Sequence, residues 1–568
     1  MIRKITLPVL LLIICFGCSK KGNNPVNPVT KVTPVDTTTG KPNNEHISVF
    51  TQHNDNTRAG LNNRETVLTT ANVNSSQFGK LFNLTVDDEV YAQPLVYGNL
   101  AIGSGSHNVV FIATVNNTVY AYDGDKGNLY WKKNFTVSGM RPPRAGEMNS
   151  SWCSPYQDIT YNIGIIGSPV IDSASKTIYF VARSTDGSNF LQYLHAVDLT
   201  TGNEQAGSPV QITASVPGTG DGNVNGVVNF DPRRNNQRQA LSLVNGVVYI
   251  SYSSHCDWNP YHGWILGYNS TSLQQQIVYN VTPNGESGGL WESGQGMAAD
   301  AQGNLYVVSG NGTVGKGGYQ ESPNGTNDTN TNPDPTDPSE RGESAIKLTP
   351  SGSTLQVSSY FTPTNYYNLN INDLDYGVMG SFLIPNSNYF LTGCKDGNLY
   401  LLNKDNMGGY NYSLNQVQQI IPLNVALHCQ PSYYKGSNGE FVYVWSENDQ
   451  LRAFSFSGGK LATNPIVSTV TGPVGASGAD LSVSSNGSVS GTGILWASYG
   501  TDSNAGGPAG PGILRAFDAN DVTKELWNSG QNSADYPGYY AKFSSPTVAN
   551  GHVYLATFSK QVVVYGLK

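Results

Sequence analysis

One stretch of eleven residues gathers side chains suited to acid–base chemistry. Residues 254–264 read Ser-His-Cys-Asp-Trp-Asn-Pro-Tyr-His-Gly-Trp. A histidine near a carboxylate can transfer a proton or bind a metal ion. Aromatic rings among polar groups can instead stack against a sugar or a cofactor, and a structural loop with hydrogen-bonded imidazoles is the third interpretation. The candidate catalytic residues are His255, Asp257 and His262, and the candidate stacking residues are Trp258 and Trp264.

A second cluster lies at residues 284–295, which read Asn-Gly-Glu-Ser-Gly-Gly-Leu-Trp-Glu-Ser-Gly-Gln. Glycine lets the backbone approach a ligand closely, because it carries no Cβ atom. Any crowded loop near the axis of a repeat protein needs glycine for the same reason. The candidate ligand-binding side chains of this cluster are Glu286, Trp291 and Gln295.

Two smaller groups complete the set of candidate ligand-binding residues. Asp373 and Asp375 could bind a cation or cap a turn. His53, Asp55 and Arg58 lie near the start of the folded part, where an arginine paired with an aspartate is either a structural clamp or a functional group.

Repetition in the sequence predicts the elements that would position these groups. Ala121-Tyr122-Asp123 is followed by Gly127, and related phrases start at Ala196 and Ala516. Each phrase follows a β-rich run, so each indicates one hairpin of a repeated β unit. Eight short apolar strands carry the pattern of a half-buried sheet: Val109–Thr114, Ile178–Ala182, Val247–Tyr252, Leu305–Ser309, Tyr389–Gly393, Phe441–Ser446, Ile494–Ser498 and Val553–Thr557.

Eight units predict an all-β, eight-bladed propeller over residues 47–568. Several units are preceded by a proline-containing strand, which suits the innermost edge of a blade, because proline lacks a donor for the ladder. The last unit ends at Lys568 without an outer strand, and Lys80–Val86 is an unassigned strand before the first unit. We therefore expect this N-terminal strand to complete the last blade and remove an exposed sheet edge.

The repeated phrase also carries a family resemblance. Ala121, Asp123, Gly127 and Trp131 fit AxDxxTGxxxW, which resembles the docking motif of pyrroloquinoline-quinone (PQQ) repeats in quinoprotein alcohol dehydrogenase-like propellers. The segment 53–60 is similar to the entry segment of those propellers. The resemblance implies PQQ on the propeller axis, calcium held by Glu, Asn and Asp, a catalytic Asp and, often, adjacent cysteines.

Departures from the family pattern shape the functional prediction. The chain contains no Cys-Cys pair and no CxxCH haem motif, and one sequence does not identify a calcium triad. We therefore expect a binding module for a small molecule, carbohydrate or protein at the cell envelope. A PQQ- and calcium-dependent alcohol or sugar oxidoreductase is the first alternative, and a cofactor-free hydrolase or lyase using residues 255–262 is the second.

The N-terminus predicts export. Residues 1–17 have a charged start and an apolar run too short to span a bilayer comfortably, and Gly17-Cys18 resembles a lipoprotein cleavage site. The resemblance implies lipidation of Cys18 and anchoring at the outer membrane. Residues 19–46 carry almost no large apolar side chain, so we expect 18–46 to be a disordered tether. An ordinary secretory signal is the alternative.

Charge and cysteine content add two further expectations. The net charge is −8 and no basic face is evident, which argues against nucleic acid as a partner. Export permits disulfides. Cys153 and Cys256 are the candidate pair, and free buried thiols are the alternative.

Overall fold

The computed structural model describes residues 46–568, apart from 151–152, 318–333, 474, 476 and 503–509. The chain divides into two compact units, residues 1–39 and 40–568, and every described residue belongs to the second. The predicted signal peptide 1–17, the lipidation site Cys18 and nearly all of the tether 18–46 lie outside the described residues. Among the described residues, no helix is long and apolar enough to cross a membrane.

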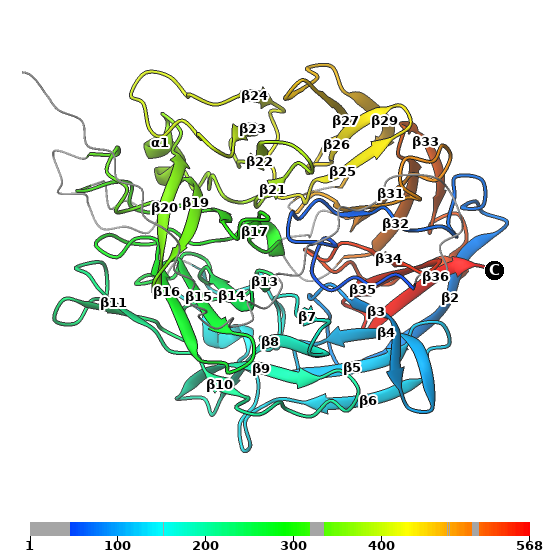
Figure 1. Cartoon of the computed structure of the whole chain (residues 1–568), viewed down its shortest axis with the longest axis horizontal. Helices are drawn as coiled ribbons and strands as arrows, with labels where there is room; N and C mark the ends of the chain where they lie inside the picture. The colour runs from blue at the N-terminus through cyan, green and yellow to red at the C-terminus, as the bar shows by residue number, and fades with distance from the viewer. Residues whose placement is uncertain (1–45, 151–152, 318–333, 474, 476, 503–509) are drawn as a thin grey trace, which may run out of the picture. The chain divides into compact units, whose positions relative to one another are not determined.

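The described chain is almost entirely β and forms the eight-bladed propeller that the repeats predict (Figure 1). Each blade is a sheet of four main antiparallel strands, ordered below from the axis outward. The first four blades are β3 (Leu95–Ile102), β4 (Gly105–Ala113), β5 (Thr118–Asp123) and β6 (Leu129–Asn134); β7 (Val170–Asp172), β8 (Thr177–Thr185), β9 (Phe190–Asp198) and β10 (Val210–Gln211); β13 (Ser242–Val244), β14 (Val247–Tyr252), β15 (Trp264–Asn269) and β16 (Gln275–Asn280); β17 (Ala298–Ala299), β18 (Leu305–Val308), β19 (Ala345–Ser351) and β20 (Thr354–Phe361).

The other four blades follow the same plan. They are β21 (Phe382–Leu383), β22 (Tyr389–Gly393), β23 (Asn398–Asn403) and β24 (Gln419–Pro422); β25 (Ser432–Gly436), β26 (Gly439–Val444), β27 (Gln450–Ser457) and β29 (Ile466–Thr471), with β28 (Lys460–Leu461) also on β27; β30 (Asp480–Ser484), β31 (Ile494–Gly500), β32 (Gly512–Asp518) and β33 (Asp521–Asn528), with β1 (Leu61–Asn62) on β30; β34 (Thr547–Ala549), β35 (His552–Thr557), β36 (Gln561–Leu567) and β2 (Phe78–Thr85). The remaining elements are β11 (Ser215–Pro217), β12 (Val227–Asn229), the helix α1 (Tyr366–Ile371) and three 3-10 turns at Ala145–Met148, Glu292–Gly294 and Ser533–Asp535.

The repeated phrase joins one blade to the next. Trp131 donates its indole N–H to the carbonyl of Leu199 at 2.9 Å. A Cβ atom at Gly202 would lie only 2.7 Å from the Trp131 ring, and Gly202 has φ +68°. Glycine is therefore needed twice, for the turn and for the close approach. The tryptophan of the first copy thus docks on the glycine of the second, as a packing anchor between blades.

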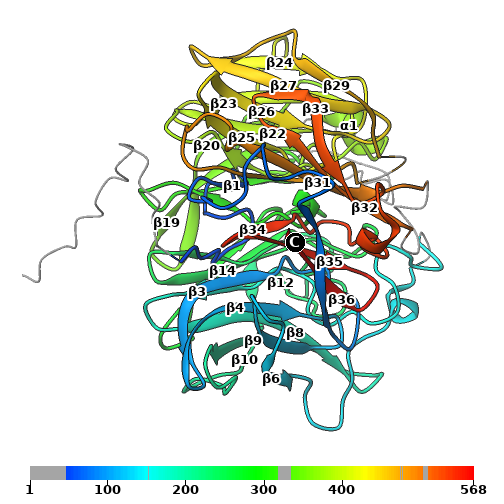
Figure 2. The ribbon, with the colours of Figure 1, turned by 90° about the vertical axis from the view of Figure 1, so that its right-hand side faces the viewer.

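The N-terminal strand closes the ring, as predicted. The strand β2 pairs antiparallel with β36, and Phe82 lies opposite Val564. Both the ribbon and its view after a 90° turn show the blue start of the chain beside the red C-terminal strands (Figures 1 and 2). Each supplies the other with ladder partners, so β36 lies inside the sheet and β2 becomes its outer strand.

Residues 47–62, which we name the clasp, hydrogen-bond to the innermost strand of every blade. Their backbone and asparagine side chains reach eight partners in chain order around the ring: Val96, Ile171, Leu243, Ala299, Leu383, Tyr433, Val483 and Val548. These partners lie on β3, β7, β13, β17, β21, β25, β30 and β34. The clasp therefore fastens all eight blades together at one end of the axis.

Candidate functional site

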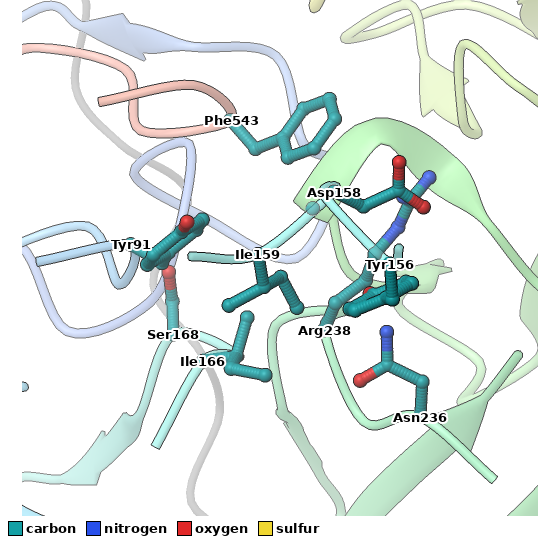
Figure 3. Close-up of a pocket in the computed structure, with 10 residues that line it drawn as sticks. Tyr91, Tyr156, Asp158, Ile159, Ile166, Ser168, Asn236, Arg238 and Phe543 are labelled. Atoms are coloured by element: carbon teal, nitrogen blue, oxygen red, sulfur yellow. The ribbon is translucent and has the colours of Figure 1, made fainter. Parts of the chain in front are cut away.

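A cavity lies at the other end of the innermost strands. Seven of its lining residues lie within six residues before an innermost strand, whereas the clasp pairs with residues within those strands. Every blade begins with its innermost strand. The cavity residues and the clasp partners therefore lie at different heights along the propeller axis. The complete lining is Tyr91, Tyr156, Asp158, Ile159, Ile166, Ser168, Asn236, Arg238, Gly294 and Phe543 (Figure 3). The cavity volume is about 10 Å³, which holds about one water molecule.

Arg238 is the most constrained cation of this end, which we name the axial mouth. Its guanidinium carbon lies 5.1 Å from the centre of the Trp291 ring and 4.8 Å from that of Phe543. Its Nε atom donates to the carbonyl of Trp291 at 3.1 Å. A cation between two aromatic faces gains about 0.5–2 kcal/mol from each, more where water is excluded. The two rings and the one hydrogen bond thus hold the guanidinium in a single orientation.

Three more ionisable groups surround the same cavity. Lys542 precedes Phe543 and is only 6% exposed, and burial lowers its pKa to about 8, although the charge of Asp158 opposes the shift. Burial raises the pKa of Glu89, whose carboxylate accepts a hydrogen bond from Thr160. Both cations and carboxylates therefore lie beside the cavity.

The loop 136–162, which we name the covering loop, supplies three of the ten lining residues: Tyr156, Asp158 and Ile159. Cys153 in this loop forms a disulfide with Cys256, with the two Cα atoms 6.0 Å apart. Cys256 belongs to the connection between β14 and β15. The disulfide therefore ties the covering loop to the third blade beside the cavity. Cys394 and Cys429 are free and buried.

A cluster of carboxylates lies next to Trp291. A Cβ atom at Gly310 would meet both Asp375 and Trp291, which places these side chains against one stretch of backbone. The Nζ atom of Lys395 lies 2.6 Å from Asp375 and 3.1 Å from Asp373. Burial alone would raise the pKa of Asp375, but the Lys395 ammonium holds it below its usual range. The structure thus brings Asp373 and Asp375 together, with a lysine between them.

Asp257 belongs to the same end of the axis. It is 8% exposed and accepts a hydrogen bond from the hydroxyl of Tyr261. Burial raises the pKa of Asp257 to about 8, and the charges of Asp375 and Asp373 add to the rise. At neutral pH this group is therefore largely a neutral carboxylic acid.

The residues at the axial mouth do not match calcium-bound PQQ. The Lys395 ammonium already occupies the space between the two aspartates where a cation would coordinate. Within the described ranges, no three His, Cys, Asp or Glu side chains are grouped so as to hold a metal ion. We therefore derive no chemical step through PQQ or calcium.

The two histidines of the 254–264 stretch have separate structural partners. The Nε2 atom of His255 lies 2.9 Å from Nη1 of Arg183, and burial lowers the pKa of His255 well below its usual value. Both ring nitrogens of His262 are used, by the hydroxyl of Thr282 at 3.0 Å and the carbonyl of Asp221 at 2.9 Å. The structure therefore does not assemble His255, Asp257 and His262 as one acid–base group.

The predicted stacking and ligand-binding residues divide between core and mouth. Trp264 is fully buried in the core on β15, so no ligand can reach it. Trp258 carries the guanidinium groups of Arg233 and Arg234 at 5.0 and 5.2 Å from its ring centre. Trp291 contacts Arg238, which lines the cavity.

Two polar residues of the 284–295 cluster serve the backbone. Gln295 is fully buried and donates to the carbonyl of Ser381 at 3.1 Å. Glu286 is 4% exposed, and its backbone N–H donates to the hydroxyl of Thr313 at 3.0 Å. Neither lines the axial cavity.

The 53–58 group belongs to the clasp rather than to the cavity. His53 uses both ring nitrogens on buried acceptors or hydroxyls, and burial lowers its pKa to about 4. Asp55 is exposed and caps a turn by accepting from Thr57. All five N–H groups of Arg58 go to carbonyls and hydroxyls. The expected Asp55–Arg58 clamp is thus replaced by a clamp of Arg58 on the backbone.

Sequence reasoning missed most of the cavity residues. Arg238 and Phe543 stand in polar connections without a motif, and three chain segments must meet before Arg238 lies between two rings. One signal was available: seven of the ten lining residues, such as Ser168, lie within six residues before an innermost strand. In a ring of repeats, such positions converge on the axis from different blades.

Comparison with known proteins shows the fold. No family model matches the chain, and no curated protein matches it either. Among solved structures, it resembles the quinohemoprotein alcohol dehydrogenase ADHIIG from Pseudomonas putida HK5, with TM-score 0.54 and 13% identity over 92% of this chain and 80% of that chain. The same values apply to quinohemoprotein alcohol dehydrogenase from Comamonas testosteroni.

A europium-containing methanol dehydrogenase has TM-score 0.53 and 11% identity, covering 92% of this chain and 99% of that chain. At these identities the likeness concerns the propeller fold. The chain thus has a propeller like those of quinoprotein alcohol and methanol dehydrogenases.

Proposed function

We propose that this protein is an exported, membrane-anchored propeller that acts as a binding module at the cell envelope and holds a small ligand at its axial mouth. One observation carries the proposal: the clasp occupies one end of the axis, and the other end has a cavity lined by aromatic and charged side chains. A rigid scaffold that presents a few polar groups in a concave, partly apolar site is typical of a ligand-binding protein.

The test asks whether small ring compounds bind in the cavity. Benzoate, benzylamine and benzyl alcohol have one ring and differ in charge. Binding to the native state raises the melting temperature. We expect at least one compound to do so for the wild type and not for Phe543→Trp, which fills the cavity. Phe190→Trp is the control, because Phe190 is also half-buried beside an arginine but lies outside the lining. A shift that persists in Phe543→Trp, or no shift at all, contradicts the proposal.

A separate arm tests the oxidoreductase alternative suggested by the fold. PQQ and calcium chloride are added to the purified protein, and the melting temperature and dye-linked alcohol or sugar oxidation are measured. Because Lys395 stands between Asp373 and Asp375, we expect neither a shift nor turnover. Turnover that depends on both additions would replace the binding module with an enzyme.

The membrane anchor is tested independently of the cavity. Wild type and Cys18→Ser are expressed with the complete N-terminus, and membrane and soluble fractions are compared. We expect Cys18→Ser to leave the membrane fraction, because a lipidated cysteine is the proposed attachment. Equal membrane association of both forms would contradict the anchor and leave the binding function unaffected.

A further inference from the structure

A groove lies between the outer strands of the first two blades, and we name it the inter-blade groove. Its lining comes from β6 and the segment after it, from β9, and from the turn that leads from β9 to β10. It shares no lining residue with the axial cavity. The groove volume is about 390 Å³, and small-molecule sites commonly measure about 300–1,000 Å³. The groove is therefore large enough for a small ligand.

The short outer strand of the second blade leaves this groove open. The strand β10 has two residues, which pair with Tyr193 and Leu194, so His195 lies beyond the end of β10. Tyr193 and His195 are two residues apart on β9, and their side chains therefore lie on the same face of the sheet. The His195 ring packs against Phe135, with ring centres 5.3 Å apart. This face is thus turned toward the first blade.

His195 lines the groove and uses only one of its ring nitrogens. The residue is 4% exposed, and its Nδ1 atom lies 2.7 Å from Oε1 of Glu204. Because a carboxylate only accepts, the neutral imidazole carries its proton on Nδ1, and Nε2 is an acceptor. Nε2 has no partner among the described residues. A buried acceptor without a donor costs about 1–3 kcal/mol, so a donor from a ligand would be bound favourably.

Three other polar groups of the lining keep hydrogen-bonding capacity. The Tyr193 hydroxyl and the Asn203 side-chain nitrogen make no hydrogen bond within the described part of the chain. The Lys133 ammonium donates to the Asn203 side-chain oxygen, which uses one of its three N–H groups. The groove therefore offers an acceptor at His195 and donors at the other three residues.

Charge and apolar surface narrow the class of ligand. Lys133 is the cation and Glu204 the carboxylate among the described residues of the lining, so their charges balance. Phe135 and Tyr193 supply aromatic surface. A matching ligand has hydroxyl groups, which both donate and accept, an apolar ring face and no net charge. A neutral sugar ring has all three properties.

We propose that the inter-blade groove binds a neutral saccharide unit, with one sugar hydroxyl donating to Nε2 of His195 and another accepting from Lys133. The apolar face of the sugar packs on Tyr193. Because Nε2 is enclosed in this structure, a side chain of the groove wall turns aside as the sugar enters, a change that is common at binding sites. This site is separate from the axial mouth and goes beyond the proposed function.

The experiment measures binding of three neutral glycosides to the full chain by calorimetric titration and saturation-transfer NMR. The probes are methyl β-glucoside, methyl β-galactoside and methyl α-mannoside. Glucuronate and glucosamine add one charge of either sign, and cyclohexanol keeps a ring with one hydroxyl. We expect at least one neutral glycoside to bind, each charged sugar to bind at least about twofold more weakly, and cyclohexanol not to bind. No binding of any neutral glycoside, or tighter binding of a charged sugar, overturns the inference.

His195→Phe removes the acceptor and keeps an aromatic ring beside Phe135. We expect the variant to remain folded, as its unliganded melting temperature would show, and to bind the glycoside about 3- to 10-fold more weakly. His107→Phe is the matched control. His107 also pairs with a carboxylate, Asp123 at 3.3 Å, but lies outside the groove and should change affinity less than about twofold.

Lys133→Met tests the donor and keeps the apolar stem. We expect the affinity to fall about 3- to 10-fold. Lys132→Met is its control, because Lys132 is the exposed neighbour on β6, points to the other face of the strand and does not line the groove. Affinity that survives in folded His195→Phe and Lys133→Met proteins overturns the inference.

One further variant separates this inference from the proposed function. Phe543→Trp changes the axial mouth and should leave glycoside binding unchanged. If Phe543→Trp abolishes glycoside binding and His195→Phe does not, the sugar binds at the axial mouth, and only the inter-blade groove is refuted. If the ring compounds fail to bind the axial mouth while a glycoside binds through His195, the proposed function fails and this inference stands.

Discussion

The two ends of the propeller axis each place one arginine near the centre, and the two arginines do different work. Arg58, in the clasp, is fully buried, and its five N–H groups reach five protein acceptors. Arg238, at the axial mouth, lines the cavity and gives one N–H to an acceptor within the described part of the chain. An arginine whose donors are all used holds the fold together, whereas one whose donors are left free is available to a ligand.

Replacing Arg58 should produce the largest change in stability. Arg58→Met leaves the buried carbonyls of Leu241 and Gln52 without their side-chain donor and removes one of the two donors to Met297. We expect the free energy of unfolding to fall by about 3 kcal/mol or more, measured by denaturant titration. Arg64→Met is the control, because Arg64 is exposed and should change stability by at most about 0.5 kcal/mol. A small effect at Arg58 would erase the distinction between the two ends.

Removing the disulfide should have the next largest effect on stability. Its local consequences should be confined to the axial mouth. We expect the double variant Cys153→Ser, Cys256→Ser to lose about 2–4 kcal/mol, since the bond closes a long loop in the unfolded chain. Protease cleavage within residues 136–162 should become faster, because the covering loop has lost its attachment. If cleavage moves to the clasp instead, the covering loop is not what the disulfide holds.

Changing Trp291 should sharpen the comparison further. Trp291→Leu removes one aromatic face from Arg238 while keeping an apolar side chain. We expect the affinity for whichever ring compound binds the cavity to fall about 2- to 10-fold, in line with the worth of one cation–π contact. Stability should change less than in Arg58→Met. A folded variant with unchanged affinity would show that the rings do not orient the guanidinium.

The smallest predicted effect is a dependence of the free energy of unfolding on pH, which arises from a buried carboxyl group between the two ends of the axis. Burial raises the pKa of Glu292 from its ordinary value to about 8, and one of its oxygens has no recorded partner among the described residues. The fold therefore binds this proton more tightly than the unfolded chain. This contribution to stability is complete below about pH 4.5 and is lost as the pH rises through about 8.

Glu292→Gln tests that dependence directly. We expect the variant to gain about 1–2 kcal/mol relative to wild type at pH 9 and to show a flatter stability profile from pH 5 to 9. Some slope should remain, because burial also raises the pKa of Asp480, to about 7. An unchanged slope would mean that Glu292 is ionised in the fold.

The architecture could be predicted because local patterns repeat. Apolar strands alternate with tight turns, Trp131 stands at a fixed distance from its hairpin, and an unpaired strand near Phe82 matches a missing one near Val564. Each feature is visible within a few residues or through copies of itself, so one sequence was enough for the fold.

The site could not be predicted to the same degree, because it depends on meetings between distant segments. Trp264 has the residue type of a stacking group, but its place in β15 turns it into the core. Arg238 has no motif, and it becomes a candidate only when the rings of Trp291 and Phe543 lie against its guanidinium. Residue types indicate which chemistry is available. The arrangement of the blades determines which of these side chains lie close enough together to act jointly.

The pairing of β2 with β36 also determines when the ring can close during folding. The strand β2 has no ladder partner until β36, Gln561–Leu567, has been synthesised. The clasp likewise reaches its final partner, Val548, only near the end of the chain. A protein that leaves its ribosome or translocon N-terminus first can therefore complete this ring only after nearly the whole polypeptide has emerged, and folding should be slow and all-or-none in its final step.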